Sequence, residues 1–216
     1  MGKSLHHRLG AAVVLAIAMG AAAWGAEAGA PESYAVDPVH SSATFKVEHL
    51  GISWVAGRFD DLAGKCALDE TDPAKSSCEL TIKTASIDTN NAQRDKHLRS
   101  EDFLNVEQFP EMTFKSTSVK KAAAAPRPAG EAAPTPPAAE ADACYEVTGD
   151  FTMHGVTKPV TVVLRGGKRA EFPKGTQRIG FFTKFSLKRS DYGMTKLPGA
   201  VGDVVNIAIS VEAIKK

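Results

Sequence analysis

The segment Asn91–Pro110, NAQRDKHLRSEDFLNVEQFP, could support acid–base chemistry. Within nine residues it gathers ionisable side chains that include Arg94, Asp95, His97, Arg99, Glu101 and Asp102. An enzyme could use His97 as a general base oriented by Asp95, while Arg94 or Arg99 held an anionic group. This chemistry is the basis of an enzymatic hypothesis for the chain.

Helical spacing argues against that hypothesis. The residues from Ala92 to Leu104 favour a helix, with Asn90 or Asn91 as its N-cap. Side chains face each other on a helix when they are three or four positions apart, so positions 95 and 97 lie on different faces. Asp95 is instead expected opposite Arg99, and Arg94 opposite His97 and Leu98. A solvated helix that covers another element, or that touches the polar end of a ligand, fits this pattern better than catalysis does.

Other motifs that could carry chemistry are few. The histidines His40, His49 and His154 show no HxH or HxxxH spacing, so no zinc or haem site is expected. Neither a glycine-rich phosphate loop nor a Gly-x-Ser-x-Gly elbow occurs, and no cofactor is expected. In KRSDYGM, Arg189 and Asp191 could tie a loop together through charge-assisted hydrogen bonds. Alternatively, Arg189 could contact a phosphate or quinone oxygen of a ligand.

Three cysteines follow the first 28 residues. If the chain turns at Asp72-Pro73, antiparallel pairing places Cys66 opposite Cys78, because the two positions are symmetric about 72. A Cys66–Cys78 disulfide is therefore predicted. Cys144 would then be a buried apolar residue or a thiol that reacts with a second chain, as in a redox or stress accessory protein. The alternative is that all three are buried thiols.

The beginning of the chain predicts export. Residues 1–28 combine basic residues, an apolar run from Gly10 to Trp24 and small residues suited to cleavage near positions 26–30. A retained membrane anchor is the weaker alternative, because this run is rich in alanine and short for a bilayer span. The charge is balanced, with 26 Lys and Arg against 25 Asp and Glu, so no nucleic-acid partner is expected. The remaining residues, 31–216, suit a single domain.

From Ser33 onwards, apolar and polar residues alternate with a period of two, which predicts antiparallel β-strands. The first four, within residues 41–84, are expected to form a meander, and the whole chain eight or nine strands. A two-sheet sandwich and a closed barrel both satisfy the alternation, but short connections and glycines within strands favour the barrel. Residues 122–142, rich in Ala and Pro, predict a flexible insertion that acts as a spacer or a recognition segment.

Four segments resemble, in order, the blocks of the YceI-like polyisoprenoid-binding proteins. They are YAVDPVHSSATFKVEHLGISWVAGRF, RDKHLRSEDFLNVEQFPEMTFKS, VTGDFTMHGVTKPVTV and FSLKRSDYGMTKLPGAVGDVVNIAISVE. The resemblance implies an exported, periplasmic, lipocalin-like barrel of eight antiparallel strands whose tunnel takes a long isoprenoid or similar chain. The insertion at 122–142 and the Cys66, Cys78 pair depart from the family pattern and leave the rim of the barrel uncertain.

The resemblance makes a lipid carrier or storage protein, rather than an enzyme, the leading hypothesis. Its ligand would be a polyisoprenoid such as a quinone or an isoprenyl phosphate. The apolar residues expected to line the tunnel are Phe45, Val47, Trp54, Phe59, Phe114, Phe151, Met153, Phe181, Phe185, Ile207 and Ile209. The residues expected at a head group or in a lid are Arg94, His97, Phe103, Arg189 and Asp191. The alternative for the first set is a solid core without a ligand.

Overall fold

The computed structural model describes residues 29–123 and 143–216. The predicted signal peptide and almost all of the predicted insertion lie outside these residues. The strands are β1 (Glu32–Val36), β2 (Ser42–His49), β3 (Ser53–Phe59), β4 (Leu62–Leu68), β5 (Ser77–Lys83), β6 (Ile87–Asp88), β7 (Glu111–Ala122), β8 (Ala143–Met153), β9 (Val156–Glu171), β10 (Gln177–Lys188) and β11 (Val201–Lys215). The helix α1 spans Ala92–Arg99, and 3-10 turns lie at Pro73–Lys75, Thr84–Ser86 and Arg189–Tyr192.

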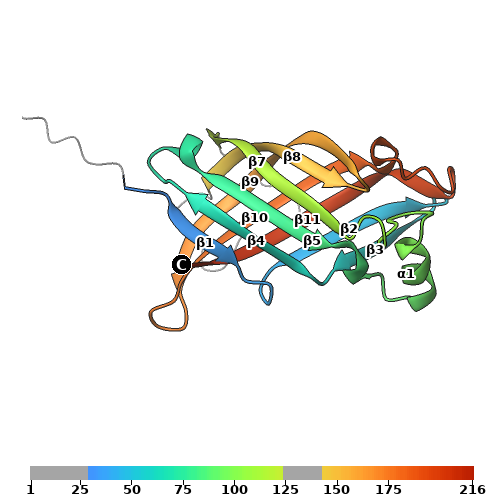
Figure 1. Ribbon diagram of the computed structural model, residues 1–216, viewed down its shortest axis with the longest axis horizontal. Helices are drawn as coiled ribbons and strands as arrows, with labels where there is room; N and C mark the ends of the chain where they lie inside the picture. The colour runs from blue at the N-terminus through green and yellow to red at the C-terminus, as the bar shows by residue number, and fades with distance from the viewer. Residues whose placement is uncertain (1–28, 124–142) are drawn as a thin grey trace, which may run out of the picture.

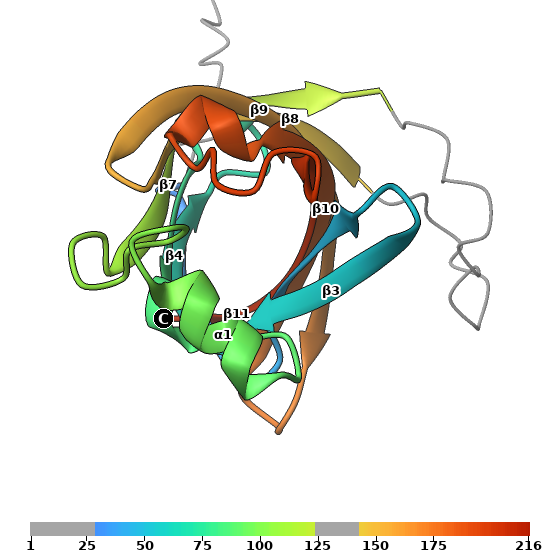
Figure 2. The same ribbon diagram turned by 90° about the vertical axis from the view of Figure 1, so that its right-hand side faces the viewer.

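Eight of the described strands close into an antiparallel barrel, as predicted. They pair in the order β1, β4, β5, β7, β8, β9, β10 and β11, and β11 returns to β1 with Tyr34 opposite Lys215. Figure 1 shows the strands running obliquely along the elongated barrel, and Figure 2 shows the ring from the end that α1 crosses. A ring of about eight strands is wide enough to hold one small ligand or a layer of side chains.

The predicted meander is wrong, because β3 and β4 are not neighbours. The long strand β11 pairs with β1 through residues 213–215 and with β2 through residues 201–210. The β2–β3 hairpin therefore continues the wall beyond the ring, and β3 pairs with the short β6. Strand β4 pairs instead with β1. Strand β1 was not predicted as a separate element because only five residues carry its pattern.

The helix is shorter than predicted, ending at Arg99 rather than Leu104. Asn91 caps it by accepting a hydrogen bond from the Arg94 N–H, one of the two caps expected. At its end, the Ser100 hydroxyl donates to the His97 carbonyl and Ser100 adopts an extended backbone, which stops the helix. The chain then turns so that Phe103 and Leu104 are buried. A turn after Arg99 is enough to bury these two side chains, so the helix does not have to continue to Leu104.

The end of the barrel away from α1 is filled by a second, smaller core. Tyr34, Ile179 and Ala213 are buried there, and Phe181 and Val211 pack against them. The Arg169 guanidinium lies over the Tyr34 ring and also pairs with Glu32 and Glu70. This end is therefore occupied by protein side chains.

Candidate ligand-binding tunnel

The interior of the barrel holds two connected apolar cavities. The inner cavity encloses about 900 Å³ and the lid cavity about 880 Å³, counting space between atoms that is partly open to solvent. Five residues line both cavities and so mark their junction: Ile82, Met112, Phe151, Phe185 and Ile209. We call the two cavities together the tunnel.

The inner cavity lies within the closed ring. Its wall is built from the inward positions of successive strands, so paired residues such as Phe181 and Val211 both face it. Aliphatic and phenyl side chains dominate the wall: Val36, Leu80, Phe114, Val147, Val160, Val162, Leu164, Phe181, Phe182 and Val211. Such a wall favours a hydrocarbon chain over any polar ligand.

The lid cavity lies under α1 and the turn that follows it. Leu98, Phe103 and Leu104 cover one side of it, and residues of β2, β10 and β11 form the other. Phe103 packs edge-on against the His97 ring, with 5.0 Å between ring centroids. This segment therefore covers the lid cavity with apolar side chains.

Ten of the eleven predicted tunnel residues line at least one cavity; the exception is Trp54. Its side chain is 55 % exposed and lies under the Lys46 ammonium, 5.2 Å from the ring centroid. Trp54 and Phe59 are five positions apart in β3 and so must point to opposite faces of the strand. Phe59 lines the lid cavity, which leaves Trp54 outside.

Two glycines make room for predicted tunnel residues. A Cβ atom on Gly57 would lie 2.5 Å from the Phe45 ring, and one on Gly149 would lie 2.5 Å from the Phe114 ring. Any larger residue at either position would push the ring out of place. Sequence reasoning missed other lining residues, including Met112, Leu164 and Val211, although each follows the same alternation as its predicted neighbours.

The arginines of the lid are tied to the backbone. Arg94 donates to the hydroxyl and carbonyl oxygens of Thr89, and Arg99 donates to the carbonyls of Ala85 and Ile87. Asp95 is buried and accepts hydrogen bonds from the Thr89 N–H and hydroxyl. The expected Asp95–Arg99 and Arg94–His97 contacts are therefore wrong, because each side chain finds a partner in the preceding loop. These groups attach the lid to the barrel.

His97 points away from the tunnel. Its Nε2 lies 3.0 Å from an oxygen of Asp102, whose other oxygen lies 2.9 Å from the Lys196 ammonium. Hydrogen bonds from Lys196 and His97 lower the pKa of Asp102 below its usual value. The residue that sequence reasoning paired with His97 was Asp95; in the structure it is Asp102. The side chains of these three residues are between a third and a half exposed.

Arg189 is buried and donates to three backbone carbonyls, those of Met194, Val201 and Gly202. These bonds fit the loop-tying role. Arg189 also lines the lid cavity, so the head-group role stays a prediction. Asp191 does not pair with Arg189. It is about half exposed and lies 3.5 Å from the Lys158 ammonium.

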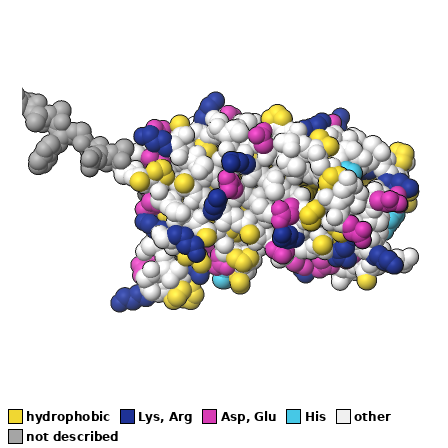
Figure 3. Space-filling view, viewed as in Figure 1, with side chains coloured by type: hydrophobic (Ala, Val, Ile, Leu, Met, Phe, Trp, Pro, Cys, Tyr) yellow, Lys and Arg dark blue, Asp and Glu magenta, His cyan; other side chains and the backbone are white. Residues whose placement is uncertain are grey.

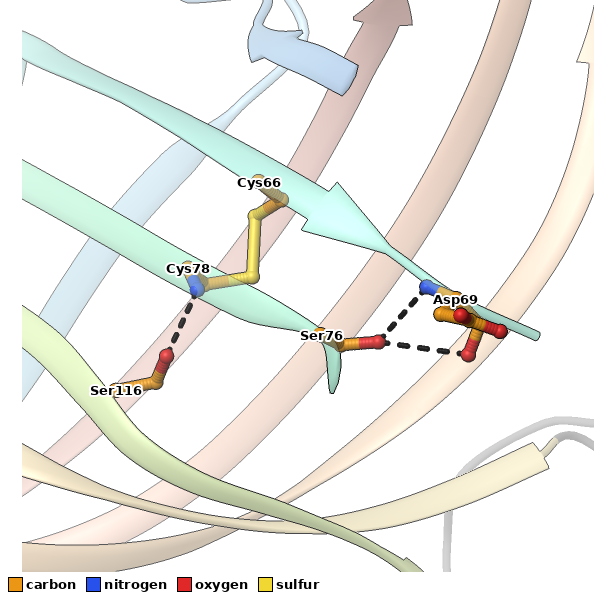
Figure 4. Close-up of a disulfide and its surroundings, with 5 residues drawn as sticks. All are labelled: Cys66, Asp69, Ser76, Cys78 and Ser116. Carbon is orange, nitrogen blue, oxygen red and sulfur yellow. Dashed lines mark hydrogen bonds between the residues drawn. A yellow bond between two sulfur atoms is a disulfide. The ribbon is translucent and has the colours of Figure 1, made fainter. Parts of the chain in front are cut away.

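The predicted disulfide is present and faces the inner cavity. Cys66 and Cys78 are directly paired between β4 and β5, with 4.2 Å between their Cα atoms. The Cys78 N–H donates to the Ser116 hydroxyl on β7, and the Ser76 hydroxyl accepts from the Asp69 N–H in the connecting turn (Figure 4). Cys144 is buried in β8, which does not favour a thiol that reacts with a second chain.

A polar cluster closes the seam of the barrel between β1, β10 and β11. Asp37, His40 and Glu212 bring potential metal-ligand atoms together, but Arg178 donates to both carboxylates and already balances their charge. Hydrogen bonds from His40 and Arg178 lower the pKa of Asp37 to about 2. Those from Lys215, Arg169 and Tyr34 lower the pKa of Glu32 to about 2. Both carboxylates thus hold the seam in their ionised form.

The outer wall carries acidic and basic side chains in mixture, as the face in Figure 3 shows. Among the described residues, no helix combines the length and apolar character needed to cross a bilayer.

Comparison with known proteins places this geometry in context. The sequence profile of the YceI-like domain matches residues 34–213. A UPF0312 protein of Ectopseudomonas mendocina is 38 % identical over 203 residues, which cover 93 % of this chain and 96 % of the relative. Protein YceI of Salmonella arizonae is 39 % identical over 177 residues, with 82 % and 83 % covered. A polyisoprenoid binding domain from Saccharophagus degradans superposes with a TM-score of 0.63 at 16 % identity, covering 86 % and 99 %, a likeness of fold alone.

Proposed function

The chain belongs to the YceI-like family, and we propose that it is a periplasmic lipid-binding protein. The ligand is a polyisoprenoid, such as a quinone or an isoprenyl phosphate, held without covalent bonds for transport, storage or stress response. The observation that carries this proposal is the tunnel, which consists of two apolar cavities that share five lining residues. It lies inside a barrel whose ribbon is elongated (Figure 1). The polyisoprenoid binding named for the Saccharophagus degradans domain supports it.

The apolar wall of the tunnel accounts for the expected affinity for a hydrocarbon chain. Removing a hydrocarbon chain from water stabilises the complex by about 0.8 kcal/mol per CH₂ group, so several isoprene units supply most of the binding free energy. Methyl branches of an isoprenoid fit between phenyl rings such as Phe151 and Phe185 at the junction of the cavities. The polar head then lies at the lid end, because the opposite end is filled by the core around Tyr34.

An enzyme that acts on a lipid-like substrate is the second candidate, and the His97–Asp102 pair is the feature that favours it. That pair is on the outside of the lid, whereas Phe103 and Leu98 separate it from the tunnel. A periplasmic location is supported by the predicted leader and by the Cys66–Cys78 disulfide, since such bonds persist in oxidising compartments.

The proposal is tested by the chain-length dependence of binding. Val211 faces the far end of the inner cavity, so Val211→Trp shortens the tunnel without adding charge. For a series of prenols with increasing numbers of isoprene units, calorimetry should show wild-type affinity rising with length. In Val211→Trp the rise should stop at a shorter chain, and the longest prenols should bind about tenfold or more weakly.

Val163→Trp is the matched control. It is the same substitution, made at a residue that is exposed on the outer wall of β9. It should behave as wild type. Affinity that does not depend on chain length in the wild type, or equal plateaus in both variants, would count against a tunnel that holds the chain.

A further inference from the structure

Exposed apolar side chains gather at one end of the molecule. Of the eight large hydrophobic residues that are most exposed in the described part of the chain, five lie at the end that carries the lid. We call these five the apolar tip: Leu50, Ile52, Trp54, Leu197 and Val204. Ile52 is 83 % exposed and so contributes nothing to the core. Large exposed apolar side chains that gather at one end of a protein mark an interaction site.

The backbone brings the members of the tip together. Leu50 and Ile52 lie in the β2–β3 turn and Leu197 in the loop before β11, and the Leu50 N–H donates to the Ala200 carbonyl at 2.8 Å. Both segments lie at the right-hand end of Figure 1, the end that carries α1, and face the viewer in Figure 2. Val204 follows on β11, opposite Lys188 of β10.

Two members of the tip are held in an unfavourable backbone conformation. Leu50 has φ of 55° and Leu197 has φ of 54°, a left-handed region in which glycine and asparagine are the usual residues. Neither leucine gains burial in return, since both are exposed. Folding alone therefore does not account for leucine at these two positions.

The tip continues the lining of the tunnel to the outside. Val47, Val201 and Val205 line the lid cavity, and Val201 is paired with His49, next to Leu50. Neighbouring residues in a strand are about 3.3 Å apart, so the apolar lining reaches the tip within a few residues. The other end of the barrel is filled around Tyr34. The tip therefore lies next to the lid cavity, at the end of the barrel that the core around Tyr34 does not fill.

The charged residues around the tip are of both signs. The turn residues 49–53 and 194–200 contain His49 and Lys196, of which Lys196 pairs with Asp102, while Glu48 lies opposite Trp54 and Asp203 precedes Val204. The Lys46 ammonium lies over the Trp54 ring, and Lys188 lies beside Val204. Tryptophan and lysine flanking an apolar group are typical of protein surfaces at the boundary between lipid head groups and acyl chains.

We propose that the apolar tip docks on the surface of a phospholipid bilayer. The isoprenoid chain then passes between the bilayer and the tunnel mouth without crossing water. The transfer of an isoprenoid rests on the proposed function. Docking on the bilayer itself can be measured without any isoprenoid.

The test is flotation with vesicles of phosphatidylethanolamine and phosphatidylglycerol, using protein purified after processing in the cell. Wild type should float with the vesicles, and Ile52→Glu should reduce the bound fraction about tenfold or more, because it places a charge in the apolar contact. Phe172→Glu is the matched control. Phe172 is 72 % exposed in the β9–β10 turn, the orange loop at the opposite end in Figure 1. It should float as wild type does.

Trp54 supplies a second readout. The sequence has two tryptophans, Trp24 and Trp54, and Trp24 falls within the predicted leader. Removal of that leader makes Trp54 the sole tryptophan, so vesicle docking should shift its emission to shorter wavelength. Ile52→Glu should abolish the shift and Phe172→Glu should retain it.

Uptake of a prenol delivered from detergent separates this inference from the proposed function. Docking predicts normal uptake by Ile52→Glu from detergent but slower uptake from vesicles. Docking is overturned if wild-type protein does not float, or if Ile52→Glu floats as well as Phe172→Glu. It is also overturned if the protein binds no vesicles and the tip instead forms a dimer that Ile52→Glu dissociates. Vesicle binding that Ile52→Glu removes, in a protein that takes up no prenol, supports docking and refutes the carrier function.

Discussion

A guanidinium group that donates to backbone carbonyls holds a segment in place and has little left to offer a ligand. Arg99 and Arg189 both make such bonds, and Arg94 bonds to Thr89 in the same manner. At the residue scale, the charges that resemble a catalytic centre therefore organise the lid and the loop before β11. The apolar neighbours Leu98 and Phe103 line the lid cavity, as does Arg189, whereas Arg94 and Arg99 do not.

His97 provides the sharpest test at this scale. Since its ring pairs with Asp102 on the outer surface of the lid, His97→Ala should change prenol affinity by no more than about twofold. Leu98→Asp, one residue further along α1, places a charge against the lid cavity and should weaken binding about tenfold or more. Fluorescence titration with a quinone would measure both. A large loss in His97→Ala, with Leu98→Asp unaffected, would favour the enzymatic hypothesis.

At the scale of elements, the β4–β5 hairpin combines two kinds of constraint. Antiparallel pairing places Cys66 opposite Cys78, and the disulfide then closes the hairpin where it borders the inner cavity. The turn is independently supported by Asp69, which accepts hydrogen bonds from Thr71 and Asp72. The disulfide thus acts mainly on the unfolded chain, whose freedom it restricts.

Reducing the disulfide should lower the free energy of unfolding by about 2–3 kcal/mol. Urea unfolding with and without reductant would measure this difference. The double variant Cys66→Ala, Cys78→Ala should show no response to reductant, because Cys144 is outside the bond. A response of equal size in the double variant would mean that the reductant acts elsewhere.

The elements also show what alternation can and cannot predict. Period two identified the barrel strands and indicated ten residues that line the two cavities. With the symmetry about Asp72, it also predicted the disulfide. It did not predict that β1 separates β4 from β3, because strand neighbours depend on contacts between distant parts of the chain. Trp54 was assigned by its apolar character against its own phase in β3. The bonds of Arg94 and Arg99 were missed because backbone carbonyl partners leave no trace in residue types.

At the scale of the whole molecule, the closure of the barrel depends on ionised carboxylates at the two ends of β1, those of Glu32 and Asp37. Glu32 joins β1 to β9 and β11 through Arg169 and Lys215, and Asp37 joins the end of β1 to Arg178 of β10. A closed ring is what keeps the tunnel wall continuous. Protonation at this seam should therefore affect folding and ligand retention together.

Acid should destabilise the protein in a defined range. The pKa of Glu32 is lowered from 4.5 to about 2, and that of Asp37 from 3.8 to about 2. Their stabilisation is complete above the unfolded values and is lost as the pH falls from about 4.5 towards about 2, where the folded groups bind protons. Melting temperatures at a series of pH values should fall in this window and stay level just above it.

Glu32→Gln is the comparison for that series. It should be less stable than wild type at neutral pH and lose less on acidification, so the two curves converge at low pH. Parallel curves would show that Glu32 does not contribute to the acid response.

The most direct test of the central claim, that the barrel carries an isoprenoid chain in its tunnel, is native mass spectrometry of the protein gently purified from its source. The account predicts a fraction with an added mass of a prenyl lipid, which Val211→Trp shifts to shorter chains or removes. Protein that is uniformly free of any such adduct, and that stays so after incubation with prenols and quinones, would contradict it.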